Sequence, residues 1–215
     1  GSTSAPQGYM GRPVLHRVVW VDQCSTGLYG STSAPQCFMG RPVRHRVLWV
    51  GRLVAQKAVS EAVDLAKMMP KVEFVFYGYG SSKREKSLIR SLPKNATFMG
   101  KAKHGWASDP QFNDCILLNT SLWDGMPNTV VEALCNGIPV CSTPVGGLVE
   151  LHQSSSGQGL TLFASDDSSM RAETLSEILH SGNFSFDNSY YVARFSKTNL
   201  QRILVSRFGA YLGMR

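Results

Sequence analysis

The sequence predicts an α/β protein with a three-layer, doubly wound and mostly parallel sheet. From residue 45 onward, short apolar runs of strand length alternate with longer stretches of helical periodicity. Glycine stands at or directly after the end of several runs, as at Gly51, Gly78 and Gly100. Strands and helices that alternate in this way are typical of a parallel sheet with crossover helices on its faces.

The apolar runs give six predicted strands, each short enough to be a buried parallel strand. The strands are predicted at residues 45–51, 72–77, 96–99, 115–118, 139–142 and 157–163. Because ligands of such sheets bind outside the carboxyl ends of the strands, we expect the turns that follow these runs to form the binding site.

Helical periodicity fills the intervals between these runs. In the first helix Val59, Val63 and Ala66 fall on the inward face, and Ser81 or Ser82 can cap the second. The helices are predicted at residues 57–69, 83–91, 106–113 (a weak helix that Pro110 begins or interrupts), the stretch that Gly137 ends, a short helix opened by Gly146-Gly147, 172–180 and 190–211.

Composition is that of one folded globular domain. The chain has 215 residues, 43% hydrophobic and 17% charged, and no apolar run approaches the ~20 residues of a membrane span. It has five cysteines, an odd number without a Cys-x2-Cys pair, so buried reduced thiols are favoured over zinc ligands. With no signal peptide in the sequence, we expect a cytoplasmic protein.

The net charge of +7 suits nucleic acid, an anionic membrane surface or a phosphate-bearing small ligand. The basic residues are scattered and do not alternate with aromatic residues, so we expect no nucleic-acid partner. Contact with a membrane surface stays open, because cationic residues cluster near both ends of the chain.

The amino-terminal part contains an internal duplication. Residues 1–21 return as residues 30–50 with four substitutions, and one 29-residue step is too few copies for a solenoid. Only the second copy continues into a turn that suggests a binding role, Gly51-Arg52-Leu53. We therefore predict a domain at residues 45–215, preceded by an extension at residues 1–44 that is flexible or lies along a sheet edge. An edge position would allow a strand-exchange dimer.

The stretch around residues 115–140 predicts an anion site. A buried strand is followed by a turn with Gly125 and Pro127 and then by a helix, whose first N–H groups attract phosphate. Two acids, Asp124 and Glu132, frame this turn. An acid suits such a site only if it hydrogen-bonds another group, such as sugar hydroxyls, so the stretch predicts a nucleotide-sugar pocket.

A second stretch, Gly51-Arg52-Leu53-x-x-x-Lys57, places two cations after the first strand. Arginine can bind two phosphate oxygens at once, and lysine adds a mobile point charge. Taken alone the pattern is weak, because cations near a helix start are commonly solvated. Its position on the same sheet edge as the acidic pair strengthens it.

Several motifs occur together in one order. They are Gly51-Arg52-Leu53-Val54-Ala55-Gln56-Lys57, Phe98-Met99-Gly100, Asp124-x7-Glu132 within residues 121–133, Gly137-Ile138-Pro139-Val140 and Val145-Gly146-Gly147. This order resembles the C-terminal, donor-binding half of the retaining GT-B glycosyltransferases of family 4, in which the acidic motif reads Glu-x7-Glu. The resemblance runs from His45 to the last helix and implies a Rossmann-like half of a GT-B fold.

The resemblance implies a role for each matching residue. Arg52 and Lys57 match the pair that neutralises the donor diphosphate as leaving group, and Gly51 precedes them. Asp124 matches the acid that holds hydroxyls of the donor sugar, and Glu132 the acid that holds the ribose. The remaining predicted contacts are Gly125, Met126 and Pro127 along the sugar, Asn128 and Thr129 at the phosphate, and Lys101 beside the base. The resemblance implies no metal and no cofactor.

Three departures from the family pattern matter. Asp124 is one methylene shorter than the usual glutamate, and Ala58 stands where the family has glycine, which we expect a helix start to tolerate. The amino-terminal half of the two-domain fold, which carries the acceptor site, has no counterpart in residues 1–44.

The predicted function is glycosyl transfer from a nucleoside-diphosphate sugar to a hydroxyl acceptor, with this chain alone incomplete and inactive. The alternative is a non-catalytic nucleotide-sugar-binding module, or a subunit whose acceptor domain is on another chain. A sugar-nucleotide epimerase is a third and weaker candidate. His104 is favoured as a solvated loop residue, and Gly78-Tyr79-Gly80 is only a weak match to a dinucleotide fingerprint. Trp123 has two open interpretations, stacking on a sugar or base and capping the edge of the core.

Overall fold

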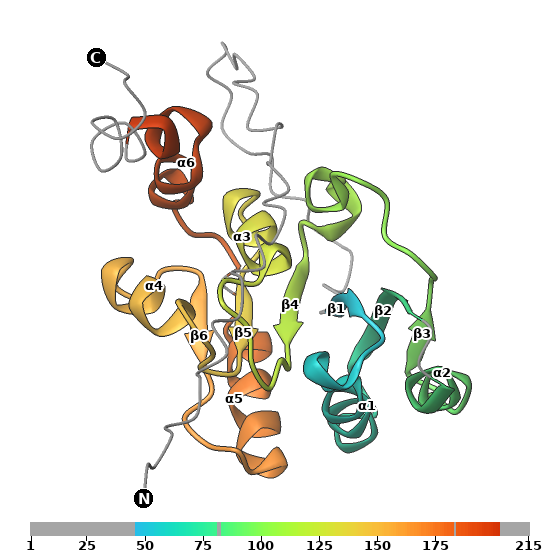
Figure 1. Cartoon of the computed structure of the whole chain (residues 1–215). Helices are drawn as coiled ribbons and strands as arrows, with labels where there is room; N and C mark the ends of the chain where they lie inside the picture. The colour runs from blue at the N-terminus through green and yellow to red at the C-terminus, as the bar shows by residue number, and fades with distance from the viewer. Residues whose placement is uncertain (1–45, 81–82, 183, 203–215) are drawn as a thin grey trace, which may run out of the picture.

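The computed structural model describes residues 46–80, 83–182 and 184–202, and its core is one six-stranded sheet (Figure 1). The strands are β1 (Arg46–Arg52), β2 (Glu73–Tyr79), β3 (Ala96–Phe98), β4 (Cys115–Asn119), β5 (Val140–Ser142) and β6 (Leu160–Leu162). They lie in the order β3-β2-β1-β4-β5-β6, and every pair is parallel. The predicted doubly wound α/β fold is confirmed. The predicted extension, residues 1–44, lies outside the described residues.

Helices cover both faces of the sheet (Figure 1). One face carries α1 (Val59–Met68), α2 (Lys83–Arg90) and α5 (Ser168–Ser181), and the other carries α3 (Asn128–Cys135), α4 (Leu148–Ser154) and α6 (Ser189–Phe195). Short 3-10 turns are η1 (Ala55–Lys57), η2 (Trp106–Ser108) and η3 (Pro110–Phe112). This arrangement gives the three predicted layers.

The sheet separates two hydrophobic cores. Successive residues of β1 alternate between them: Val47 and Trp49 pack under α1 and α5, whereas Leu48 packs under α3. All five residues of β4 are buried, because this strand lies between β1 and β5 with helices above and below. The Trp49 indole donates a hydrogen bond to Thr120 Oγ1 over 3.1 Å, which ties β1 to the end of β4.

The second strand runs two residues further than predicted, to Tyr79. Gly78 pairs with Gly51 of β1, and a Cβ atom at Gly78 would lie 2.9 Å from the Gly51 carbonyl oxygen. This glycine therefore serves close packing between strands rather than a turn. The sixth strand is shorter than predicted, since Gly157 and Gly159 adopt positive φ and form a turn before Leu160.

The first helix does not begin at Lys57 as predicted. Lys57 ends the 3-10 turn η1, and Ala58 separates η1 from α1 with φ 41° and ψ 50°. The expectation that a helix start would tolerate Ala58 is wrong in its premise. The position lies outside the helix in the left-handed region that glycine occupies without steric cost.

Two other predicted helices are divided in the structure. The stretch at residues 106–113 forms the separate turns η2 and η3, with Asp109 capping the second through Gln111 N. The last predicted helix is interrupted at Ser196, whose backbone is extended, and helical residues resume at 197–202.

Candidate functional site

The loops after β4 and β5 are packed tightly at the carboxyl edge of the sheet. Gly147 N donates to Gly125 O over 2.7 Å. Gly146 has φ 51°, and a Cβ atom there would lie 2.0 Å from the Asp124 carbonyl oxygen. Thr143 Oγ1 donates to Ser121 O over 2.6 Å. Glycine at position 146 therefore allows the backbone contact that fixes the turn bearing Asp124.

Lys57 and Asp124 form the most direct link between the predicted phosphate and sugar residues. Their Nζ and Oδ2 atoms are 2.5 Å apart, and their side chains are 13% and 19% exposed. Lys57 comes from η1 and Asp124 from the turn after β4. Two residues 67 positions apart are thus brought together, as expected of residues at one sheet edge.

Arg52 is exposed at the end of β1 and belongs to the same region. Its Nη2 donates to Gln56 Oε1 over 3.3 Å, and Gln56 Nε2 donates to Trp123 O over 2.8 Å. Gln56 O also accepts from Leu122 N over 2.9 Å. Gln56 therefore couples residues 52–57, called the cationic turn below, to the turn after β4 that bears Asp124, called the acidic turn. This role could not be predicted from the spacing, because it depends on which loop faces residue 56.

Glu132 of α3 is held by a residue that the sequence analysis did not single out. The Trp106 indole of η2 donates to Glu132 Oε2 over 2.6 Å. Trp106 is buried and makes an edge contact with Phe112, with ring centroids 5.8 Å apart. No described residue donates a hydrogen bond to the other carboxylate oxygen, Oε1. That oxygen is therefore left for a ligand.

The pKa of Glu132 is raised above its ordinary value, with burial as the largest cause. The Trp106 hydrogen bond and the charge of His104 act in the opposite direction. His104 therefore lies close enough to Glu132 to influence it, although its side chain is exposed as predicted.

The other predicted contacts lie around these two pairs. Asn128 and Thr129 begin α3, whose N-cap Pro127 makes no side-chain cap and whose first turn has no acid. The first N–H groups of α3 thus keep their affinity for an anion. Gly51 lies in β1 one residue before Arg52. Met126 lies under Gly147, where an added Cβ would be 2.7 Å from its methyl group.

Lys101 is exposed after β3 and pairs with an aromatic ring. Its Nζ atom lies 5.2 Å from the ring centroid of Tyr79, which ends β2 and is 53% exposed. Trp123 is 59% exposed, which argues against the core edge, one of the two roles left open for its side chain. Aromatic surface is therefore available on two sides of the cationic turn.

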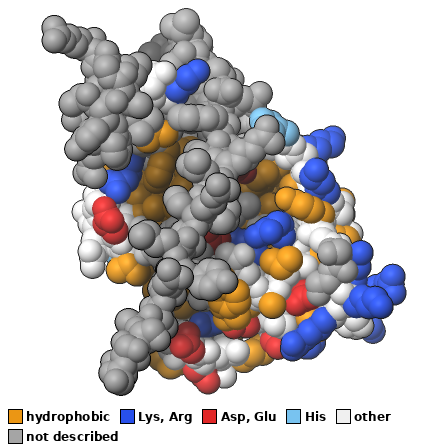
Figure 2. All heavy atoms as spheres, viewed as in Figure 1, with side chains coloured by type: hydrophobic (Ala, Val, Ile, Leu, Met, Phe, Trp, Pro, Cys, Tyr) orange, Lys and Arg blue, Asp and Glu red, His pale blue; other side chains and the backbone are white. Residues whose placement is uncertain are grey.

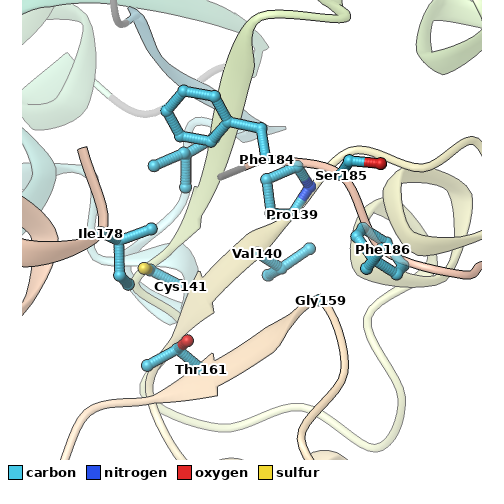
Figure 3. Close-up of a pocket in the computed structure, with 10 residues that line it drawn as sticks. Pro139, Val140, Cys141, Gly159, Thr161, Ile178, Phe184, Ser185 and Phe186 are labelled. Atoms are coloured by element: carbon cyan, nitrogen blue, oxygen red, sulfur yellow. The ribbon is translucent and has the colours of Figure 1, made fainter. Parts of the chain in front are cut away.

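A hollow of about 220 Å³ lies elsewhere, at the amino ends of β5 and β6 (Figure 3). Its lining includes Pro139, directly before β5, and Val140 within β5; Gly159, directly before β6, and Thr161 within β6; and Phe184 from the segment after α5. None of the predicted site residues lines this hollow. The predicted site is instead an open edge formed by several loops.

The described residues include no group of three or more His, Cys, Asp or Glu side chains arranged to hold a metal ion. Burial raises the pKa of Cys115 to about 11 and that of Cys141 to about 12, which leaves these thiols protonated and unreactive. Cys115, Cys135 and Cys141 are buried as predicted, whereas Cys24 and Cys37 lie outside the described residues. Across the described part of the chain, no helix combines the length and apolar character that a membrane span requires.

Solved structures of glycosyltransferases share this fold. Sucrose-phosphate synthase from Thermosynechococcus elongatus superposes with a TM-score of 0.63 at 20% identity, covering 81% of this chain and 46% of that chain. HepE from Anabaena, solved with UDP and glucose, superposes with a TM-score of 0.64 at 18% identity, covering 77% and 48%. The match spans about half of each solved protein, as expected of one Rossmann-like half of a GT-B fold.

Sequence comparison identifies the family. The phosphatidylinositol N-acetylglucosaminyltransferase gpi3 subunit of Schizosaccharomyces pombe is 31% identical over 113 residues, or 51% of this chain and 24% of that protein. The match thus spans about a quarter of this curated relative. The family described as glycosyl transferases group 1 matches residues 44–181, more than half of the chain. The chain belongs to the glycosyl transferases group 1 family.

Proposed function

We propose that this chain is the donor-binding half of a retaining glycosyltransferase that uses a nucleoside-diphosphate sugar. The observation that carries the proposal is the 2.5 Å pair between Lys57 and Asp124, next to the amino end of α3. This pair supports the proposal because a cation of the kind that binds phosphate lies beside an acid that can accept hydrogen bonds from sugar hydroxyls. A site that binds phosphate alone would not contain such an acid, because a carboxylate repels phosphate.

The diphosphate would lie between Arg52, Lys57 and the first N–H groups of α3. During transfer the bond between the anomeric carbon and the diphosphate oxygen breaks, and its electron pair leaves with the diphosphate. The acceptor oxygen bonds to the anomeric carbon on the same face, and its proton passes to the departing diphosphate oxygen. Arg52 and Lys57 stabilise the negative charge that develops on the leaving group, so the proposal requires no metal or cofactor.

The sugar and the ribose would be held by the two acids. Asp124 accepts hydrogen bonds from sugar hydroxyls, with Gly125, Met126 and Pro127 along the sugar ring. Glu132 accepts from the ribose through the oxygen that Trp106 leaves free. Lys101 would border the base, next to the ring of Tyr79.

The acceptor side requires a second domain. The solved relatives are about twice as long as the region matched here. We therefore expect this chain alone to bind the donor without transferring the sugar. The acceptor domain would lie on a longer form of the protein or on a partner chain.

A second candidate is a non-catalytic module or a subunit of a larger transferase. The relative from Schizosaccharomyces pombe is itself called a subunit, and its name specifies N-acetylglucosamine as the sugar and phosphatidylinositol as the acceptor. By analogy we propose N-acetylglucosamine as the first donor sugar to test. A lipid acceptor would also explain a position at a membrane surface.

Calorimetry with UDP, GDP and ADP and with UDP-N-acetylglucosamine, alongside a product assay, tests both halves of the proposal. We expect at least one diphosphate to bind and no sugar to be transferred to phosphatidylinositol or other alcohols. Absence of binding to the whole panel would overturn the donor-site assignment. Transfer by the isolated chain would overturn its incompleteness.

A further inference from the structure

Charge is distributed very unevenly along the folded domain. Residues 83–103 hold seven Lys or Arg residues and one acid, a net charge of +6, whereas residues 104–189 hold one Arg and ten acids. All seven cationic side chains are exposed. They are Lys83, Arg84, Lys86, Arg90, Lys94, Lys101 and Lys103, and they are called the basic edge below.

The charge of the basic edge is not neutralised within the described structure. None of its seven members takes part in an ion pair with a described residue. The one acid of the segment, Glu85, is 7% exposed and points away from solvent. The positive charge of the basic edge is therefore exposed to solvent and available to an anionic partner.

The basic edge extends over a surface instead of converging on a cavity. On α2, Lys83, Lys86 and Arg90 are spaced by three and four residues and share one helical face. The opposite face packs Leu88 and Ile89 against the core under the sheet. Figure 2 shows Lys and Arg side chains along the right-hand side of the molecule, over β3 and α2. A spread of this kind fits a broad anionic plane better than a single phosphate.

We propose that the basic edge binds the anionic surface of a lipid bilayer. Clusters of four to eight cations bind acidic headgroups through summed attraction. Met99, which follows β3 and is 55% exposed, offers an apolar side chain next to them. Single-stranded nucleic acid is the less favoured partner, because it requires uncovered aromatic platforms. Tyr79, an exposed aromatic residue beside the basic edge, carries Lys101 over the face of its ring.

Membrane contact at the basic edge would add to the proposed function, and its role in sugar transfer rests on that function. Lys101 and Lys103 follow β3 at the carboxyl edge of the sheet, where Arg52 ends the second strand along. A bilayer against the basic edge would therefore lie beside the donor site. A lipid acceptor could then be reached from the membrane while the nucleotide is held from the aqueous side.

Co-sedimentation of the full chain with vesicles tests the proposal. The vesicles contain phosphatidylcholine with 30% phosphatidylserine or phosphatidylcholine alone, at low and high salt. The test variant is K83Q/R84Q/K86Q/R90Q, all on α2. The control is K67Q/K71Q/K197Q/R202Q, which removes the same charge from exposed positions elsewhere. Melting temperature and UDP binding of each variant are measured in parallel.

We expect salt-sensitive binding to the acidic vesicles alone, at least tenfold weaker in the α2 variant and within about threefold of wild type in the control. Equal loss in both variants would overturn the proposal, as would absence of vesicle binding. Binding of single-stranded oligonucleotides that depends on α2, without vesicle binding, would assign the edge to nucleic acid instead. Unchanged UDP binding in the α2 variant would separate this result from the fate of the donor site.

Discussion

Asp124 and Lys57 neutralise each other through a 2.5 Å ion pair, which affects how tightly a diphosphate can bind. Replacing Asp124 by Asn keeps the size of the side chain and removes its charge. Lys57 is then available to phosphate oxygens, and an ion pair of this kind is worth about 1 kcal/mol. We predict that D124N binds a nucleoside diphosphate about fivefold more tightly than wild type.

Calorimetry of D124N with the diphosphate and with the diphosphate sugar measures this effect. The sugar should add less affinity in D124N than in wild type, because its hydroxyls lose an ionised acceptor. Unchanged or weaker diphosphate binding would mean that Asp124 does not compete for Lys57.

Trp106 positions Glu132, and its effect should appear in the pH dependence of nucleoside binding. The raised pKa of Glu132 means that this carboxyl protonates at a higher pH than an ordinary glutamate. Only the ionised form offers both oxygens as charged acceptors, one to Trp106 and one to the ribose. W106F removes a hydrogen bond that lowers this pKa. As the pH falls, both proteins should lose nucleoside affinity. We predict that the midpoint of this loss lies at a higher pH in W106F than in wild type.

Binding titrations between pH 4 and 8 check this prediction. His104 is the titratable group whose charge also acts on Glu132, so H104Q serves as a comparison. A purely structural role for Trp106 would weaken binding equally at every pH, without moving the midpoint.

At the level of elements, Ala58 introduces strain between η1 and α1. A φ of 41° destabilises the folded state by about 1–2 kcal/mol for an alanine. Glycine avoids this strain, but it destabilises the protein by about 0.4–1 kcal/mol because its unfolded chain is more flexible. We predict that A58G raises the free energy of unfolding by about 0.5 kcal/mol. Urea denaturation checks this, with A62G as control, because Ala62 lies in the middle of α1 and its replacement should destabilise. Equal destabilisation by both variants would show that Ala58 is unstrained.

The sequence predicted the elements better than their contacts. Alternating apolar runs located all six strands and the helices on both faces, since periodicity records which face is buried. It could not assign Gly78 to a strand, because its role depends on the neighbouring backbone of Gly51. Likewise, the spacing of residues 52–57 and 124–132 predicted one site, but the partners Gln56 and Trp106 come from long-range packing. Such contacts have no local pattern in the sequence.

At the scale of the whole molecule, the duplicated amino-terminal segment remains a prediction, because residues 1–45 are outside the described structure. The second copy ends within β1 and leads directly into the cationic turn, so the first copy should be dispensable. We predict that deletion of residues 1–29 leaves the melting temperature within a few degrees of wild type and yields a monomer. Calorimetry and light scattering check this. A large loss of stability would place the first copy in the folded core.

The site as a whole is proposed to have two ends, one for the diphosphate and one for the nucleoside. Arg52 stands at the end of β1 and Glu132 within α3, and each is bonded to a different neighbour. If the two ends act separately, substitutions at each should affect different parts of the same ligand.

Calorimetry of wild type, R52A and E132A with a nucleoside and with its diphosphate tests this most directly. R52A should weaken diphosphate binding by about 1.5–3 kcal/mol and leave nucleoside binding nearly unchanged, since a charge-assisted contact to phosphate is lost. E132A should weaken binding of the nucleoside itself. Equal losses of nucleoside and diphosphate affinity in both variants would contradict a donor site built from these residues.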